Sequence, residues 1–348
     1  MTALLLLGMA SPVHGNVSLG QGQGGRPTAT LTTPNGAHCT VYLNGAHVTS
    51  WRPAGDDERL FVSSRFFFSY LLPPCRKERH TPAVHRHECR AHMPSVPFAP
   101  RRSKWARGQP IRGGIPICFP QFAGRGPLPK HGFARVSEAW EIEESGRREG
   151  GETELILLLQ DNEQTRLIWP HSFSLRYTIT LTDAELRTAI KVENRGAEPF
   201  EFTAALHTYL GVPDVTTTSV EGLSGLMYQD NAAKGATVKE VQQMVAMDEP
   251  MPQELIDRVY VDAPERLVVR APGVAPLVLA KHGFRDAVLW NAGQVSGEAM
   301  SDLGRGEWRN YICLEAGAIV QPVKLAPQDK FEATQTLSII DSVEACGH

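Results

Sequence analysis

The stretch FSLRYTITLTDAELRTAIKV, residues 173–192, decides the fold class of this chain. Residues expected to face a core alternate with polar residues along both halves, at Phe173, Leu175, Tyr177, Ile179 and Leu181, then at Leu186, Thr188, Ile190 and Val192. This period of two is typical of a β-strand with one buried face. Thr182-Asp183 begins a short polar turn between the halves. The stretch is therefore predicted to form an antiparallel hairpin.

Strand-like patterns continue through most of the chain. Cys39, Val41 and Leu43 alternate with polar residues just before Asn44-Gly45, which is a strong hairpin turn signal. Further strands are predicted at 154–160, 200–206, 266–270, 277–280, 287–290, 311–315 and 333–340. Short helices are predicted only at Val238–Met247 and Pro252–Asp257. Many strands separated by turn signals predict an all-β fold, a large antiparallel β-sandwich with few short helices.

The strand pattern defines the expected domain organisation. Residues 28–342 are predicted to form one β-sandwich domain, after a flexible leader at 1–27 and before a tail at 343–348. An insertion at 65–102 interrupts this domain. It contains no glycine, six prolines, and eight Lys and Arg residues against two Glu, which is the composition of a disordered segment. Its cysteines and histidines could bind zinc, but their spacing matches no standard zinc finger.

Composition and charge exclude several classes of protein. The formal net charge of −3 gives no overall basic field that would attract nucleic acid. No apolar run approaches the roughly 18–20 residues that a membrane span needs. The Leu4–Leu7 run has no Lys or Arg before it, which does not favour a secretory signal. The six cysteines form no CxxC pair and suggest no disulfide framework, which favours a reducing compartment and a cytoplasmic location.

The densest group of chemically capable residues is PIRGGIPICFPQFAGRGPLPKHGFAR, residues 110–135. Arg112 precedes two glycines, which permit unusual backbone angles and close approach of a ligand. Lys130, His131 and Arg135 follow within a few residues of one another. Three cations and an imidazole beside flexible backbone could bind an anion such as phosphate. The alternative is a solvated charged loop with a core histidine; a nucleotide P-loop is excluded because no GxxxxGK[ST] occurs.

Two polar residues stand inside otherwise apolar strands. His207 lies in FTAALHTYL, residues 202–210, and Glu315 lies in YICLEAGAI, residues 311–319. A buried carboxylate needs a partner or a chemical task. Taken singly, His207 could be a satisfied core histidine and Glu315 a member of a structural salt bridge. Together they could supply an acid and a base on strands of one sandwich.

These segments resemble the glucose-6-phosphate 1-epimerases, the hexose-6-phosphate branch of the galactose mutarotase-like, or aldose 1-epimerase, superfamily. The similar segments, in family order, are IRGGIPICFPQF, LPKHGFAR, WPHSFSLRYTITL, ALHTYL, VEGLSGLMYQD, DRVY, AVLWN and CLEAGAI. The resemblance covers roughly residues 30–64 and 104–342. It implies a galactose mutarotase-like sandwich that acts on a small-molecule hexose phosphate. It also implies an enzyme that needs no cofactor or metal. We expect a monomer that, as charge and composition indicate, binds neither nucleic acid nor membrane.

The resemblance also implies a catalytic pair. His207 in ALHTYL and Glu315 in CLEAGAI match the family's catalytic histidine and glutamate. Mutarotation opens the hemiacetal when a base takes the C1 hydroxyl proton and an acid protonates the ring oxygen. The aldehyde then rotates about C1–C2 and recloses. On this resemblance Glu315 is the base and His207 is the acid.

The remaining expected site residues bind the substrate. Arg112 and Arg135 match arginines that the family uses on the substrate, including its phosphate. His131 matches a pocket histidine near the sugar ring, and Asp257 in DRVY matches a sugar-binding aspartate. Lys130 stands where the family usually has Gln, which removes an acceptor and adds a cation.

Three other functions stay open at this point. An aldose 1-epimerase for unphosphorylated sugars would not need Arg112 and Arg135. A non-catalytic carbohydrate-binding protein would have no reason to place Glu315 opposite His207. A glycoside hydrolase would need two carboxylates that flank a glycosidic bond, and only one lies in a motif with a plausible partner.

Overall fold

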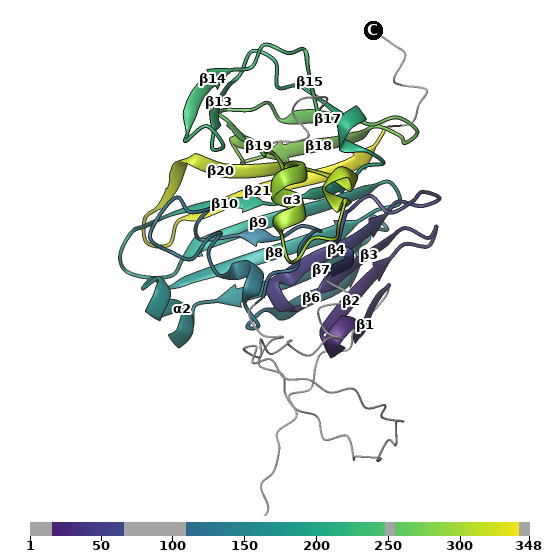
Figure 1. Ribbon diagram of the computed structural model, residues 1–348. Helices are drawn as coiled ribbons and strands as arrows, with labels where there is room; N and C mark the ends of the chain where they lie inside the picture. The colour runs from purple at the N-terminus through teal and green to yellow at the C-terminus, as the bar shows by residue number, and fades with distance from the viewer. Residues whose placement is uncertain (1–15, 66–108, 248–254, 341–348) are drawn as a thin grey trace, which may run out of the picture.

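The computed structural model describes residues 16–65, 109–247 and 255–340. Its largest sheet has nine antiparallel strands (Figure 1). The predicted hairpin lies within it as β8 (Phe173–Leu181) and β9 (Glu185–Asn194), with Leu181 opposite Leu186. That prediction is confirmed. In order across the sheet the strands are β15 (Met244–Ala246), β12 (Ser219–Glu221), β17 (Arg266–Arg270), β18 (Leu277–His282), β21 (Lys330–Ile339), β9, β8, β7 (Thr153–Gln160) and β6 (Glu141–Arg147).

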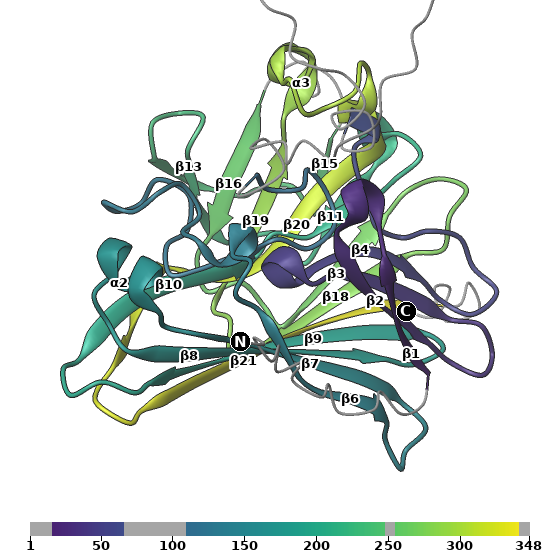
Figure 2. The ribbon, with the colours of Figure 1, turned by 90° about the horizontal axis from the view of Figure 1, so that it is seen from below.

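An eight-stranded sheet carries Asp257 and Glu315 in its strands, and His207 directly follows another of its strands. Seven of its strands run in the order β14 (Ala236–Lys239), β13 (Met227–Asp230), β16 (Ile256–Tyr260), β19 (Asp286–Asn291), β20 (Tyr311–Leu325), β10 (Phe200–Leu206) and β5 (Ile117–Cys118). The eighth, β11 (Tyr209–Gly211), also pairs with β20. Figure 2 shows β16, β19, β20 and β10 in a layer above β9, β8, β7 and β6.

The hydrophobic core joins these two sheets. Phe202 of β10 packs against Phe331 of β21, with ring centroids 5.7 Å apart. Phe119, in the loop after β5, contacts both Phe202 and Phe173 of β8. Phe119, Phe173 and Phe202 are each almost completely buried. The all-β prediction of antiparallel sheets around a shared core is therefore confirmed.

A third, four-stranded sheet corrects the predicted leader. It consists of β1 (Val17–Gln21), β2 (Pro27–Thr32), β3 (His38–Tyr42) and β4 (His47–Arg52). The leader was predicted to be flexible through residue 27, whereas Val17 pairs with Leu31 and is buried. The other four residues of β1 are exposed, so its sequence has little hydrophobic pattern. The predicted hairpin turn at Asn44-Gly45 is confirmed between β3 and β4.

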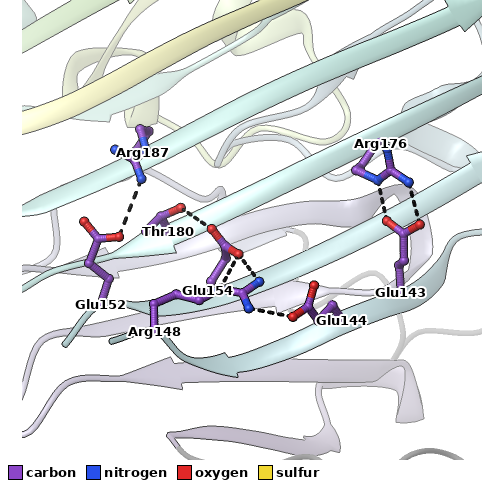
Figure 3. Close-up of polar contacts among 8 residues, drawn as sticks. All are labelled: Glu143, Glu144, Arg148, Glu152, Glu154, Arg176, Thr180 and Arg187. Carbon is purple, nitrogen blue, oxygen red and sulfur yellow. Dashed lines mark hydrogen bonds and ion pairs between the residues drawn. The ribbon is translucent and has the colours of Figure 1, made fainter. Parts of the chain in front are cut away.

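The outward face of β6, β7, β8 and β9 carries ion pairs (Figure 3). Arg176 binds Glu143 through two nitrogens, and Arg148 binds both Glu144 and Glu154. Each of these pairs is at least partly exposed, so each contributes little to stability. The apolar side chains of the same strands point into the core, which explains the period of two in this part of the sequence.

The described parts of the two predicted helices form strands instead. Val238–Met247 was predicted to be helical but contains the end of β14 and all of β15. Tyr228 pairs with Val238, and Val220 pairs with the buried Val245, so tertiary pairing overrides local propensity. Two α-helices in the described residues were not predicted, α2 (Glu163–Ile168) and α3 (Gly293–Ala299).

Several predictions fall wholly or partly outside the described residues. These are the insertion at 65–102 beyond its first residue, with its possible zinc ligands, the tail at 343–348, and part of the predicted helix Pro252–Asp257. The described part of that helix is the start of β16, which is a strand. Among the described residues, none of the helices has the length and apolar character that a membrane crossing requires.

Candidate active site

Two glycines turn the chain at the start of the predicted anion motif. Gly113 and Gly114 have φ values of 117° and 64°, which favour glycine. A Cβ on Gly114 would lie 2.1 Å from the carbonyl oxygen of Val48. The Nε2 of His47 donates a hydrogen bond of 2.7 Å to the Gly113 carbonyl. This tight packing fixes the backbone that carries Arg112.

Gly114→Ala should therefore destabilise the fold. Positive φ and a backbone clash act together, so we expect a loss of at least about 3 kcal/mol in the free energy of unfolding. Gly273→Ala is the matched control, since Gly273 has a φ of 79° but a Cβ added there would have no atom within 4 Å. It should cost only about 1–2 kcal/mol. Denaturant unfolding of both variants checks this, and equal losses would contradict the packing argument.

His207 and Glu315 lie together where two neighbouring strands meet. His207 directly follows β10, and Glu315 lies in β20, which pairs with β10. The Nδ1 of His207 is 3.3 Å from Oε1 of Glu315, and both residues are buried, with exposed fractions of 7% and 1%. The two atoms are within ion-pair distance but do not form a hydrogen bond. Among the described residues, neither His207 Nδ1 nor Glu315 Oε2 has a hydrogen-bond partner. Buried polar atoms without partners are costly, so these two atoms require an explanation, and a catalytic role is one.

Burial shifts the proton affinities of this pair in opposite directions. Burial, with a smaller contribution from Asp257, raises the pKa of Glu315 well above its usual value. Burial, followed by the nearby His131 and Arg112, lowers the pKa of His207 well below its usual value. A carboxylate of raised pKa is a stronger base, and an imidazolium of lowered pKa is a stronger acid. The pair is therefore suited to proton transfer.

Tyr209 was not predicted as a site residue, but it connects His207 to Arg112. Its ring stacks on His207 with a centroid separation of 4.8 Å and an interplanar angle of 8°. Its hydroxyl accepts a 3.1 Å hydrogen bond from Nη1 of Arg112. Trp290 packs edge-on against His207. The sequence did contain a signal for Tyr209. It is an aromatic residue two positions after His207, and residues two apart in extended chain lie on the same face.

A short polar chain orients Asp257 of β16. The Nδ2 of Asn231 donates to Oδ1 of Asp257 at 2.7 Å, and Nη2 of Arg125 donates to Oδ1 of Asn231 at 3.1 Å. The backbone N–H of Asn231 also donates to the Asp257 carbonyl. Burial raises the pKa of Asp257. Asp257 was predicted from its motif, whereas Asn231 and Arg125 were not, because their contacts depend on the register between β13 and β16.

Of the three cationic residues predicted to bind an anion, Arg112 and Lys130 line one cavity and Arg135 does not. Arg112 forms an ion pair with Asp302, from Nε at 3.1 Å and Nη2 at 2.9 Å to one carboxylate oxygen. Lys130 lines the same cavity as Arg112. Arg135 donates a hydrogen bond of 2.9 Å from Nη2 to the backbone carbonyl of Lys130. It therefore stabilises the loop that carries Lys130 and does not line the cavity. Asp302 was not predicted.

Most of the predicted site residues line a cavity of about 110 Å³. Six of the seven predicted site residues line it, and Arg135 does not. The lining consists of Arg112, Phe122, Ala123, Lys130, His131, His207, Asp257, Val288, Trp290, Met300 and Glu315. Another surface hollow, of about 1020 Å³, contains none of the predicted site residues. The smaller cavity is the candidate active site because it contains the buried His207–Glu315 pair, further ionisable groups and an aromatic wall.

Sequence comparison shows which known proteins resemble this chain. The family model described as aldose 1-epimerase matches residues 104–338. A relative from Cenchrus ciliaris named "Putative glucose-6-phosphate 1-epimerase" is 30% identical over 315 residues, which cover 88% of this chain and 83% of that protein. A protein of the same name from Escherichia coli (strain K12) is 26% identical over 302 residues, which cover 85% of each.

Solved structures share the fold. A crystal structure described as a "putative mutarotase" from Salmonella typhimurium has a TM-score of 0.72 at 23% identity, and the match covers 95% of this chain and 97% of that one. A galactose mutarotase-like protein from Lactobacillus casei ATCC 334 has a TM-score of 0.61 at 12% identity, covering 89% and 100%. At these identities the comparisons support the fold that the strand pattern predicted.

Proposed function

The chain belongs to the aldose 1-epimerase family and is an isomerase of sugars, and we propose that it interconverts the α and β anomers of glucose 6-phosphate. The observation that carries the proposal is the buried His207–Glu315 pair in a cavity that Arg112 and Lys130 also line. The acid–base pair suits ring opening, and the cations suit a phosphate. The names of the curated relatives agree with this substrate.

We assign the chemistry to the pair as follows. Glu315 takes the proton of the C1 hydroxyl while His207 gives a proton to the ring oxygen, and the bond between C1 and that oxygen breaks. The open aldehyde rotates about C1–C2. On closure His207 takes the C5 hydroxyl proton and Glu315 returns a proton to the carbonyl oxygen. No proton is gained or lost over the cycle, so the pair returns to its starting state.

Burial of the pair favours the ring-opened stage of this reaction. Before ring opening, the carboxylate of Glu315 and the imidazolium of His207 are both charged. After it, both groups are neutral. Burial raises the pKa of Glu315 and lowers the pKa of His207, so it destabilises the charged pair relative to the neutral one. Burial therefore favours the neutral pair that accompanies the open-chain sugar over the charged pair that precedes ring opening.

The substrate's phosphate is assigned to the side of the cavity that holds Arg112 and Lys130. Arg112 is held between Tyr209 and Asp302, which fixes its guanidinium. Arginine binds phosphate through two parallel N–H groups, which gives orientation as well as attraction. Asp257 of strand β16 is assigned to sugar hydroxyls. Holding both ends of the substrate would place C1 beside Glu315.

An anomer-exchange assay tests this function. Freshly dissolved α-glucose 6-phosphate is mixed with the full chain, and conversion to the β anomer is followed by NMR against the spontaneous rate. We expect exchange far faster than with free glucose at equal concentration. A rate on glucose equal to or above that on glucose 6-phosphate would instead support an aldose 1-epimerase for unphosphorylated sugars.

Arg112→Ala is expected to separate the two substrates. A lost charged hydrogen bond to phosphate costs about 1.5–3 kcal/mol, so kcat/KM for glucose 6-phosphate should fall about 10- to 100-fold. The rate on free glucose should change much less. Arg285→Ala is the control, since Arg285 is an exposed arginine paired with Asp262 outside the cavity. Equal losses on both sugars would show that Arg112 does not bind the phosphate.

A further inference from the structure

The ring of His131 is held through one nitrogen by two groups. The backbone N–H of Ala123 donates to His131 Nδ1 at 3.3 Å. The thiol sulfur of Cys118 lies 3.0 Å from the same nitrogen. Both His131 and Cys118 are buried, and Cys118 is fully so. Nδ1 of His131 therefore has two close partners within the protein.

The backbone around these groups is itself fixed. The N–H of His131 donates to the Ala123 carbonyl at 2.9 Å, and Gln121 Nε2 donates to the same oxygen at 3.0 Å. Ala123 and His131 have φ values of 48° and 64°, which few residues other than glycine adopt. Backbone strain of this kind is kept where surrounding contacts determine it. The position of the Ala123 N–H against the His131 ring is therefore not free to change.

This arrangement determines where the imidazole proton lies. A backbone N–H can only donate, so Nδ1 must be the acceptor and cannot carry a proton of its own. The Cys118 thiol must then donate as well, since a thiol that accepted would need a proton on Nδ1. We propose that the Ala123 amide and the Cys118 thiol fix His131 as the tautomer with its proton on Nε2. His131 is then a neutral, preoriented hydrogen-bond donor.

The charges around His131 agree with this tautomer. Arg135, Lys130 and Arg112 all lie near the ring, and the His207 ring is 5.4 Å away, centroid to centroid. Phe122 packs edge-on against the His131 ring, also at 5.4 Å. Burial first, and then these three cations, lower the pKa of His131 to about 3. An imidazolium would also place a second proton on Nδ1 against the Ala123 N–H.

The consequence for the reaction rests on the proposed function. A fixed donor in the cavity can hydrogen-bond a substrate oxygen and stabilise negative charge that develops there, without taking part in the proton transfers. Cys118 would then be a positioning residue that acts through His131. Its thiol would contribute to rate, although its own pKa is raised by burial and it remains a thiol.

Nitrogen NMR of the full chain tests the tautomer directly. In a ¹⁵N-labelled protein, long-range ¹H–¹⁵N correlations distinguish a protonated ring nitrogen from an unprotonated one, and His131→Gln identifies the His131 signals by their loss. We expect a protonated Nε2 and an unprotonated Nδ1 at neutral and mildly acidic pH. A protonated Nδ1, or an imidazolium in that range, would overturn the proposal. This readout does not depend on any activity.

Variants of Cys118 test the positioning role. Cys118→Ser keeps a donor, and Cys118→Ala removes it. We expect kcat on glucose 6-phosphate to fall about 3- to 10-fold in Cys118→Ala, as for one lost hydrogen bond, and to recover in Cys118→Ser. Cys39→Ala is the matched control, a thiol of equal burial in β3 away from the cavity. Equal loss in Cys118→Ala and Cys39→Ala, or no recovery with serine, would exclude the positioning role.

The two readouts separate two kinds of failure. A chain that shows the expected tautomer but no exchange of any hexose phosphate would contradict the proposed function and leave the His131 assignment standing. A chain that is active on glucose 6-phosphate but carries its His131 proton on Nδ1 would contradict only the inference about Ala123 and Cys118.

Discussion

Replacing Glu315 with Gln is expected to lower kcat on glucose 6-phosphate by about 10²- to 10⁴-fold. The amide keeps the shape of the side chain but cannot accept the C1 hydroxyl proton. Because substrate binding does not require that proton transfer, KM should change little. Exchange of the two anomers followed by NMR, with the spontaneous rate subtracted, checks the prediction.

Glu240→Gln is the matched control for this change. Glu240 is also a buried glutamate, but it binds Tyr260 and Arg258 outside the cavity. Its loss should lower stability and leave kcat close to that of the unaltered chain. If both variants lost rate equally, the effect of Glu315→Gln would reflect folding, and Glu315 would not be the base.

The same Glu315 variant should be at least as stable as the parent chain at neutral pH. The folded-state pKa of Glu315 lies above its ordinary value of 4.5, so the buried carboxyl favours the folded state only while it is protonated. This contribution to the stability of the folded state is fully present below pH 4.5 and is lost as the pH rises through the folded-state pKa. The advantage of Glu315→Gln in Tm should therefore grow as the pH rises above about 4.5 toward neutrality. A Tm difference that did not change with pH would contradict the raised pKa.

The second large effect is expected for His207→Asn. Asparagine can donate a hydrogen bond but cannot transfer a proton to the ring oxygen. The value of kcat should therefore fall by about 10²- to 10⁴-fold. The double variant with Glu315→Gln should be little slower than either single variant, because both groups act in the same proton transfers. Single and double variants are compared in the exchange assay. Losses that simply multiplied would show that the two residues act independently.

His171→Asn provides a control for the general effect of losing a histidine. His171 lies against Trp169 and Phe200, away from the cavity lining. Its replacement should leave the exchange rate near that of the parent chain. Circular dichroism and Tm of each variant, measured alongside, would show whether a loss of rate accompanies a loss of structure.

Local patterns predicted the sheets well because the alternation of apolar and polar residues can be seen within each strand's own sequence. The hairpin formed by β8 and β9 has one face in the core, so its period of two was visible without any partner. The same reasoning failed for β1, of which only Val17 is buried, and for β14, which is exposed along its whole length. Strands without a buried face leave little trace in composition.

The candidate site was predictable in its residue types and only partly in its arrangement. His207 and Glu315 stood out as polar residues in apolar strands, and their family motifs implied the roles we propose. Asp302 and Asn231 could not be found in this way, since each acquires its place from a partner far along the chain. Arg135 was grouped with Arg112 by its motif, but it supports the loop behind Lys130.

Local sequence patterns were enough to predict an all-β chain, a cationic glycine-containing loop, and a histidine and a glutamate in separate apolar strands. The pairing of β10 with β20, which brings His207 Nδ1 to 3.3 Å from Glu315 Oε1, could be seen only in the folded chain. The same holds for the contacts of His131 Nδ1 with Ala123 and Cys118. The physical reason is that alternation specifies which face of a strand is buried. Which strands pair, and in what register, depends on the packing of the whole core.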